Sequence, residues 1–269
     1  MAIHRHIRWA GASEGGTRKE KNEDSWVAFT AGAAGSMVLG ESGEAGLETQ
    51  DMIFAVSDGM GGGNAGELAS ALIIEKLSAI IPETFKAAAS GLYPDSMAYL
   101  TDVIKQVHDE INQAAAGAAE KEGMGATLAL IWFAPENLYL ANIGDSRIYL
   151  CRDGVTEQIS KDHSSAWAAW KRGEMQEAQY RSHPRRAALY GAMGGGNPEV
   201  FPHVAALPYR AGDRFLICSD GLIDGLWERK IGIKLASAAE ALTTCRELLE
   251  RAMENSGADD TTLVVIDVS

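Results

Sequence analysis

The chain has 269 residues, a formal net charge of −13 and a pI near 4.9. An acidic chain is not expected to bind nucleic acid or an anionic membrane by bulk attraction, and 46% hydrophobic residues argue against disorder. The three cysteines, Cys151, Cys218 and Cys245, form no C-x-x-C pair. This pattern argues against a disulfide framework and a structural zinc site, and favours a reducing compartment.

The start of the chain, MAIHRHIRWAGASEGG, holds no apolar core of a secretory signal. No apolar run approaches the ~18 residues that span a bilayer. We therefore expect a cytoplasmic protein.

The first elements alternate between strands and a polar loop. Residues 26–29 predict a short strand, and the small and acidic residues 31–50 predict a flexible loop or insertion between strands. Residues 52–56 are apolar and end abruptly at Ser57-Asp58-Gly59, which is typical of a buried strand that leads into a turn.

Three helices follow from apolar residues spaced three and four apart. The first is expected from Gly66 until Pro82 stops it. The second has an amphipathic stripe over residues 97–114, with Asp95 or Ser96 as its cap. The third covers residues 238–253 near the end of the chain.

The second half of the chain is rich in strands. Turn chemistry between them predicts antiparallel hairpins. The expected strands are residues 126–133, 138–143, 147–151, 155–159, 214–219 and 261–268. Residues 164–200 interrupt this pattern with a long, irregular, locally basic segment of the kind that is often functional. We expect antiparallel sheets packed face to face with helices outside, in one domain over residues 1–269.

One pattern occurs twice. Residues 54–59 and 216–221 both consist of an apolar strand followed by Ser-Asp-Gly, which places Asp58 and Asp220 at strand ends. A strand end holds a carboxylate rigidly, and the glycine leaves the backbone carbonyl approachable. Mg²⁺ and Mn²⁺ prefer several oxygen ligands from separate segments.

Other acidic residues lie at similar junctions. They are Glu23 and Asp24 before the first strand, Asp145 between two strands, and Asp259 and Asp260 before the last strand. Like charges repel unless cations neutralise them, so convergence of these ends would indicate metal binding. Without convergence they are ordinary turn and capping residues.

The ordered series of motifs resembles the type 2C, or PPM, metal-dependent serine/threonine protein phosphatases of bacterial type. The motifs cover nearly the whole chain in the family's order. They are Asn22-Glu23-Asp24, Ser57-Asp58-Gly59-Met60-Gly61-Gly62, Gly125-Ala126-Thr127, Asn142-Ile143-Gly144-Asp145-Ser146-Arg147, Asp162-His163-Ser164, His183-Pro184-Arg185-Arg186, Cys218-Ser219-Asp220-Gly221 and Asp259-Asp260-Thr261-Thr262.

The resemblance implies an α+β fold, a four-layer αββα sandwich of two antiparallel sheets flanked by helices. It also implies two Mn²⁺ or Mg²⁺ ions and a weaker third. Asp58 would bridge the two ions, Asp220 and Asp259 would hold the first, and Asp24, Glu23 and the Gly59 carbonyl would serve the second. Asp145 with Asp220 would form the third site. Residues 164–200 match the family's flap beside the active site.

The chain departs from the family pattern at four places, one of them Gly125-Ala126-Thr127 where the family usually has Gly-Thr-Thr. At the position of the family's phosphate-binding arginine this chain has Lys19, with Arg18 beside it. Either residue could contact the phosphate, but only arginine can bind it through two N–H groups. Asp260 replaces the usual asparagine, and either tightens cation binding or faces solvent. Met60 replaces the histidine that some members offer as a general acid. His163 is interpreted as structural.

The resemblance implies hydrolysis of phosphoserine and phosphothreonine in proteins by direct attack of a water activated by the metals, with Asp58 and Asp220 as catalytic residues. The expected partner is a phosphoprotein substrate of a cognate Ser/Thr kinase, with no nucleic acid, no membrane and a monomeric state. Two other functions stay open: a catalytically silent regulatory domain of this fold, and another two-metal phosphoester hydrolase, whose sites usually mix His with Asp.

Overall fold

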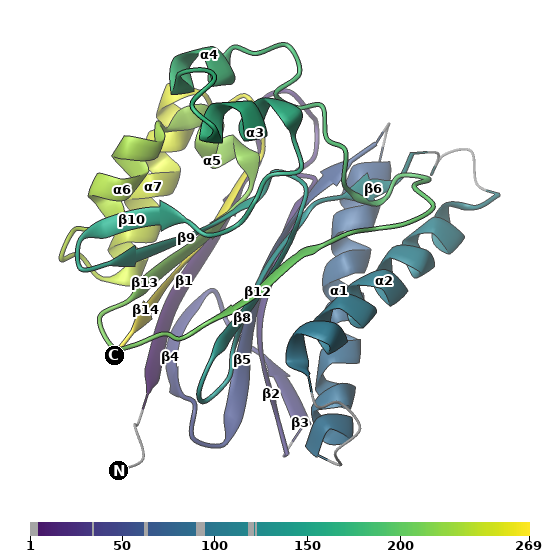
Figure 1. Ribbon diagram of the computed structural model, residues 1–269, viewed down its shortest axis with the longest axis vertical. Helices are drawn as coiled ribbons and strands as arrows, with labels where there is room; N and C mark the ends of the chain where they lie inside the picture. The colour runs from purple at the N-terminus through teal and green to yellow at the C-terminus, as the bar shows by residue number, and fades with distance from the viewer. Residues whose placement is uncertain (1–4, 34, 62–63, 90–94, 118–120, 122) are drawn as a thin grey trace.

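The computed structural model describes residues 5–33, 35–61, 64–89, 95–117, 121 and 123–269, with the backbone alone for residues 83–89. Two antiparallel sheets lie face to face between helices, and Figure 1 shows these four layers from the side. No helix in the described part of the chain is long and apolar enough to cross a membrane.

The first sheet has six strands. Their spatial order is β10 (Val155–Gln158), β9 (Arg147–Arg152), β13 (Arg214–Cys218), β14 (Thr261–Val268), β1 (His6–Glu14) and β4 (Ser42–Gly46). β1 has no counterpart among the predicted strands. It pairs with β14 over eight residue pairs, from Ile7 opposite Val268 to Glu14 opposite Thr261, so the two ends of the described chain lie side by side.

The second sheet has eight strands. Six follow in the order β11 (Met193–Gly194), β6 (Gly125–Ala126), β5 (Gln50–Met60), β7 (Leu128–Phe133), β8 (Leu138–Ile143) and β12 (His203–Leu207). The remaining two are β2 (Asp24–Gly32), which pairs with β5, and β3 (Gly35–Val38), which pairs with β2.

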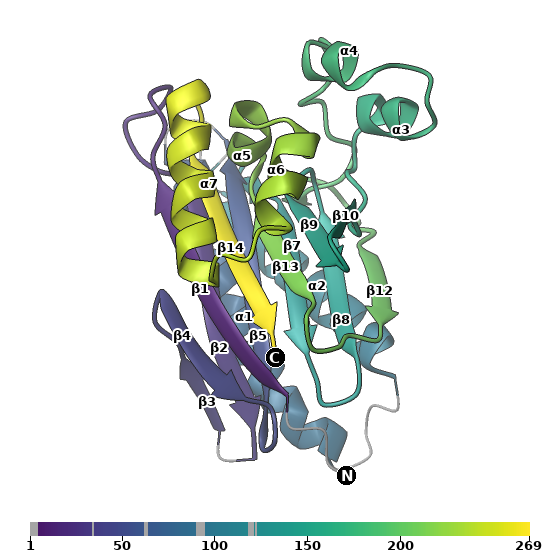
Figure 2. The ribbon, with the colours of Figure 1, turned by 90° about the vertical axis from the view of Figure 1, so that its left-hand side faces the viewer.

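Each interface between layers has its own apolar core. α1 (Ala65–Ala89) and α2 (Ser96–Ala115) pack on the outer face of the second sheet. Between the sheets, Phe133 of β7 meets Phe215 of β13 edge to face, with ring centroids 5.4 Å apart. α5 (Asp220–Gly225), α6 (Glu228–Leu235) and α7 (Ala241–Asn255) cover the other face of the first sheet (Figure 2). The predicted four-layer αββα sandwich is therefore confirmed.

The second helix forms as predicted. Asp95 is its N-cap, and its carboxylate accepts from the N–H groups of Met97 at 2.9 Å and Ala98 at 3.4 Å. The residues of the predicted stripe that face the second sheet, among them Leu100 and Ile104, are buried.

Two predictions of secondary structure are wrong. Pro82 does not end the first helix, because α1 continues to Ala89. Pro82 cannot donate a hydrogen bond to the carbonyl of Ser78, but the buried apolar face continues through Ile81 and holds the helix against the sheet.

The second error is the prediction of a flexible loop or insertion over residues 31–50. They include the end of β2 and the strands β3 and β4, which pair with β2 and β1 respectively. Neighbouring strands supply the backbone hydrogen bonds here, so these small and acidic residues need no apolar alternation of their own.

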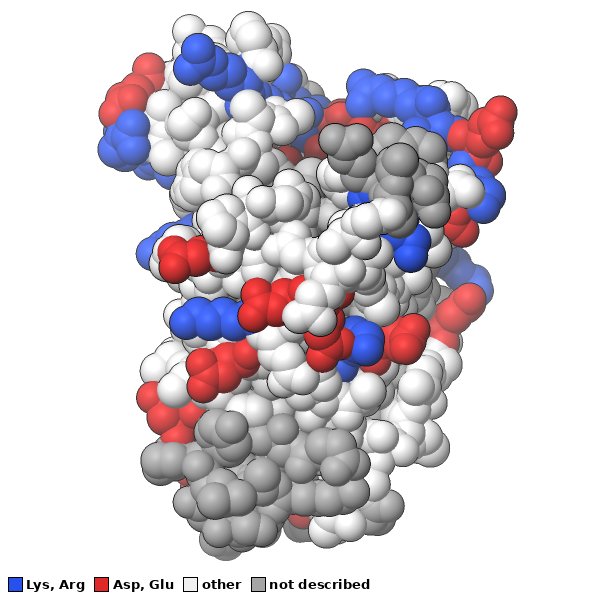
Figure 3. Space-filling model, turned by 90° about the vertical axis from the view of Figure 1, so that its right-hand side faces the viewer, with Lys and Arg blue, Asp and Glu red and all other residues white. Residues whose placement is uncertain are grey.

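The face formed by α1 and α2 carries acidic and basic side chains that alternate with uncharged surface (Figure 3). The flap segment, residues 164–200, stands at one end of the sandwich. It contains α3 (Ser165–Lys171), α4 (Glu177–Arg181) and the short strand β11, so it is more ordered than the predicted irregular segment (Figure 2).

Candidate metal centre

The predicted carboxylates converge at the end of the sandwich that carries the flap segment. Asp24 starts β2 and lies directly opposite Asp58 near the end of β5. Burial raises the pKa of Asp58 well above its ordinary value, and the negative charges of four other carboxylates raise it further. Those four are Asp24, Asp220, Asp145 and Asp259. Charges from four separate segments thus act on one side chain.

A tighter group lies within this cluster. One carboxylate oxygen from each of Asp220, Asp224 and Asp259 lies within 4.8 Å of the other two. Asp220 and Asp224 are one turn apart on α5, and Asp259 comes just before β14. Burial raises the pKa of Asp220 to about 6, with a further contribution from Asp224. A cation shared by the three carboxylates would relieve this repulsion.

Asp145 joins the cluster from the turn between β8 and β9. Its pKa is raised well above the ordinary value by burial and then by the charge of Asp220. The turn requires Gly144 at a φ of +91°, and a Cβ on that glycine would lie 2.5 Å from the side chain of Thr127. Asp145 and Asp220 therefore lie close enough to interact, as predicted.

Asp24 has an oxygen without a protein partner. Ser219 Oγ donates to its Oδ2 at 2.7 Å, whereas Oδ1 is buried and has no hydrogen-bond partner among the described residues. Burial raises the pKa of Asp24 to about 7. A buried carboxylate oxygen without a donor is expensive unless a cation or water completes it, and this donor set of oxygens suits Mn²⁺ or Mg²⁺.

Glu23 and Gly59 meet beside the start of α1. Gly59 N donates to the Glu23 carbonyl at 3.1 Å, and a Cβ on Gly59 would lie 2.2 Å from the carbonyl oxygen of Gly66. The buried Glu23 carboxylate lies against Gly66, where a Cβ would come within 2.8 Å of it. Only glycine fits at positions 59 and 66 with this close approach.

The two predicted phosphate-binding residues are ion-paired with members of the cluster. Arg18 Nη1 lies 2.8 Å from Asp259 Oδ2, and Lys19 pairs with the carboxylate of Glu23. Both side chains therefore lie at the edge of the carboxylate cluster. At the upper edge of Figure 3, acidic side chains lie between two groups of basic ones.

Three residues that belong to the cluster or contact it are missing from the predicted site. Asp224 follows Asp220 by four residues, a spacing that places both on one helix face and could have revealed it. Arg186 ends the motif His183-Pro184-Arg185-Arg186 in the basic flap segment and has no predicted role at the metal centre, yet it pairs with Asp224 and lies 3.8 Å from Asp220. Ser219, the residue before Asp220, donates a hydrogen bond from its hydroxyl to the carboxylate of Asp24.

Two other side chains have structural contacts. Asp260 neither faces solvent nor points to a free position, because its carboxylate accepts from Gly16 N at 2.8 Å and from Glu23 N at 2.7 Å. His163 Nδ1 accepts from Gly144 N at 2.9 Å, and burial lowers its pKa to about 4. The structural interpretation of His163 agrees with these contacts.

The model of the family described as protein phosphatase 2C matches residues 43–258. The chain belongs to the protein phosphatase 2C family.

Among its relatives, the serine/threonine protein phosphatase PstP of Mycobacterium tuberculosis is 34% identical over 262 residues. This match covers 97% of the chain but 45% of PstP, so the chain spans about half the length of that relative. The serine/threonine phosphatase stp of Listeria innocua is 31% identical over 217 residues, which cover 80% of the chain and 84% of the relative.

The fold matches solved structures over nearly its whole length. The catalytic domain of PstP in complex with two manganese ions is 31% identical, has a TM-score of 0.76, and matches over 98% of this chain and 99% of that domain. A serine/threonine phosphatase of S. agalactiae has a TM-score of 0.80 at 23% identity and supports the fold alone.

Proposed function

We propose that the chain is a metal-dependent protein phosphatase that hydrolyses phosphoserine and phosphothreonine in proteins. The observation that carries this proposal is the convergence of carboxylates from five segments at one end of the sandwich, in a chain of the protein phosphatase 2C family. Residues 1–269 would form one phosphatase domain, with residues 164–200 as its flap.

The metal ligands are assigned from the same cluster. Asp58 and Asp220 are the central ligands, because the other carboxylates are arranged around them. Asp24, Glu23 and the carbonyl of Gly59 would complete one ion. Asp259, Asp145 and Asp224 would complete the positions around Asp220, where the structure brings Asp224 and Asp259 together.

Two Mn²⁺ or Mg²⁺ ions, with a third more weakly held, would supply an activated water and neutralise phosphoryl oxygens when bound. The chain itself provides the basic groups for the phosphate. Arg18, Lys19 and Arg186 each neutralise a carboxylate of the cluster. A bound metal would neutralise these carboxylates and weaken their ion pairs, so the N–H donors of the three basic residues would be available to bind oxygens of the substrate phosphate. The two arginines can bind a phosphate through two N–H groups each.

The cellular setting belongs to the same proposal. We propose a monomeric cytoplasmic enzyme of bacterial signal transduction that acts on substrates of a Ser/Thr kinase. Support for a reducing compartment comes from Cys151, Cys218 and Cys245, which are all buried and free.

The test is metal-dependent turnover by the purified protein. Hydrolysis of phosphoserine, phosphothreonine and phosphotyrosine peptides is measured with and without Mn²⁺, beside Asp58→Asn and Asp220→Asn. We expect activity on the first two peptides only with metal, and a loss of at least about 100-fold in both variants. Asp153→Asn makes the same chemical change at a side chain that is 78% exposed, and serves as the matched control.

The outcomes separate the alternatives. A folded wild-type protein that binds Mn²⁺ without hydrolysing any phosphopeptide would indicate a silent regulatory domain. Preference for a nucleotide phosphodiester over phosphopeptides would indicate another two-metal hydrolase. Full activity in both aspartate variants would overturn the assignment of the ligands.

A further inference from the structure

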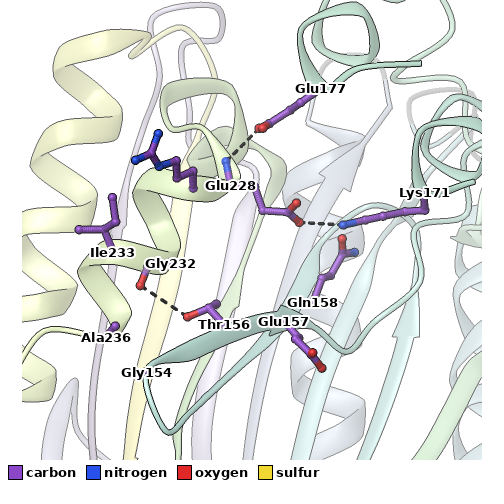
Figure 4. Close-up of a pocket in the computed structure, with 11 residues that line it drawn as sticks. Gly154, Thr156, Glu157, Gln158, Lys171, Glu177, Glu228, Gly232, Ile233 and Ala236 are labelled. Carbon is purple, nitrogen blue, oxygen red and sulfur yellow. Dashed lines mark hydrogen bonds and ion pairs between the residues drawn. The ribbon is translucent and has the colours of Figure 1, made fainter. Parts of the chain in front are cut away.

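Hydrogen bonds connect the flap segment to the helices α5 and α6. Figure 4 shows Glu228, at the start of α6, linked to Glu177 and to Lys171. Its carboxylate accepts from Lys171 Nζ of α3 at 2.8 Å, and its backbone N–H donates to Glu177 Oε1 of α4 at 2.9 Å. These contacts bring the C-terminal residue of α4 over the neighbouring helix α5.

That residue, Arg181, is bonded to the end of α5. Its guanidinium donates to three backbone carbonyls: those of Ile223, Asp224 at 2.7 Å and Leu226 at 3.0 Å. The last carbonyls of a helix have no partners within the helix, so Arg181 satisfies groups that α5 leaves open. The guanidinium also lies 4.8 Å from the ring centre of Trp227, which holds its plane in place.

Helix α5 is short and carries two members of the carboxylate cluster. Asp220 lies in its first turn, and Asp224 lies one turn later. Arg181 bonds the carbonyl of Asp224 itself, so a movement of α4 away from α5 frees the residue whose side chain must stay within 4.8 Å of Asp220 and Asp259. A helix of six residues has little stability of its own to keep that geometry.

Arg181 and Arg186 act on the cluster in different ways. Arg186 pairs with the carboxylates of Asp220 and Asp224, where it competes with a cation for the same oxygens. Among the described residues, the hydrogen bonds of Arg181 all go to backbone carbonyls and none goes to a carboxylate, so it does not compete for the carboxylate oxygens.

We propose that Arg181 is a positioning residue that holds α5 in the geometry in which Asp224 shares a cation with Asp220 and Asp259. It thereby couples the seating of the flap segment to metal affinity. The inference rests on the metal-binding part of the proposed function. Because coupling between two equilibria is reciprocal, metal binding must also stabilise the seated flap segment.

The experiment measures binding and exchange without any substrate. Mn²⁺ affinity is determined by calorimetry, and amide hydrogen exchange is followed over residues 165–186 with and without Mn²⁺. Arg181→Met keeps the apolar stem of the side chain and removes its donors. Arg181→Lys offers one donor group that cannot reach three carbonyls in the fixed geometry of a guanidinium.

We expect Mn²⁺ to slow exchange in the wild-type flap segment. Arg181→Met should weaken Mn²⁺ affinity by about tenfold, as for other residues that orient metal ligands, and should raise exchange in the flap segment. Arg181→Lys should lie between the two. Arg172→Met is the matched control, because Arg172 lies in the same segment and pairs only with Glu174 among the described residues.

Wild-type affinity in folded Arg181→Met would overturn the inference, even if flap exchange increased, since the residue would then be merely structural. The same affinity loss in Arg172→Met would overturn it too. If Arg181→Met does not fold, Arg181→Lys decides by the same measurements. If the wild-type protein binds Mn²⁺ but hydrolyses no phosphopeptide, the proposed function is wrong. The inference about Arg181 is unaffected by that result, because it concerns metal binding alone.

Discussion

Asp260 accepts a hydrogen bond from the backbone N–H of Glu23 at 2.7 Å, although 237 residues separate them. The other carboxylate oxygen accepts from Gly16 N at 2.8 Å. The carboxylate therefore clamps both ends of the loop that carries Arg18 and Lys19. The loop between β1 and β2 is thus placed by a residue next to the candidate ligand Asp259.

This clamp can be tested with Asp260→Ala. The N–H of the buried Glu23 would lose its acceptor, which should lower the free energy of unfolding by about 1–3 kcal/mol. Urea denaturation measures that loss, and calorimetry with Mn²⁺ should show weaker binding. Asp260→Asn keeps one acceptor oxygen and should lie between wild type and Asp260→Ala. Equal stability of all three proteins would contradict the clamp.

The buried pair of Arg147 and Asp162 makes a second prediction. Arg147 Nη2 lies 2.8 Å from Asp162 Oδ2, and the side chains are 2% and 0% exposed. Arg147→Met leaves the carboxylate buried without its cation, so we expect a loss of about 3–5 kcal/mol in the free energy of unfolding. Arg172→Met breaks a pair exposed by more than half on both sides and should change stability by less than about 1 kcal/mol. Similar losses in both variants would contradict the prediction.

The crowded cluster makes a third prediction, on metal removal. Burial and four neighbouring carboxylates raise the pKa of Asp58, so its charge destabilises the metal-free fold at neutral pH. Asp58→Asn should therefore raise the melting temperature without metal. It should also reduce the stabilisation that millimolar Mn²⁺ gives to the wild type. Calorimetric melting with EDTA and with Mn²⁺ measures both effects, and a lower melting temperature for metal-free Asp58→Asn would refute the repulsion.

Asp51 gives a pH dependence away from the cluster. Its Oδ2 accepts from Trp132 Nε1 at 2.7 Å, and burial raises its pKa from 3.8 to about 6. The folded state thus keeps a proton that the unfolded state has released between these values. The contribution of Asp51 to stability is complete below about pH 4 and is lost as the pH rises through 6.

Asp51→Asn does not titrate and keeps an acceptor for Trp132. Its stability relative to wild type should therefore rise between pH 4 and 6, by up to about 3 kcal/mol, and then stay constant. Urea unfolding at four pH values measures this difference. Trp132→Phe removes the donor that stabilises the charged form, so its stability should decline more steeply over the same range. A difference between Asp51→Asn and wild type that does not change with pH would rule out the raised pKa.

Parts of the fold were predictable because they rest on local pattern. The apolar stripe of α2 and its Asp95 cap follow from residues three and four apart, and β14 has the predicted bounds, residues 261–268. Helix α5 and strand β1 lack such a signal. α5 spans six residues, and β1 alternates apolar and polar residues only in its first half.

The αββα sandwich and the acidic residues at the strand ends, including Asp58, Asp145, Asp220 and Asp259, were predictable from the amino-acid sequence. These follow from patterns within a few residues and from the ordered family motifs. Three contacts became visible in the fold alone: Asp224 lies beside Asp220 and Asp259, Asp260 bonds a distant loop, and Arg181 donates to carbonyls at the end of α5. Each of these contacts joins segments far apart in the chain, and no local pattern sets the distance between such segments.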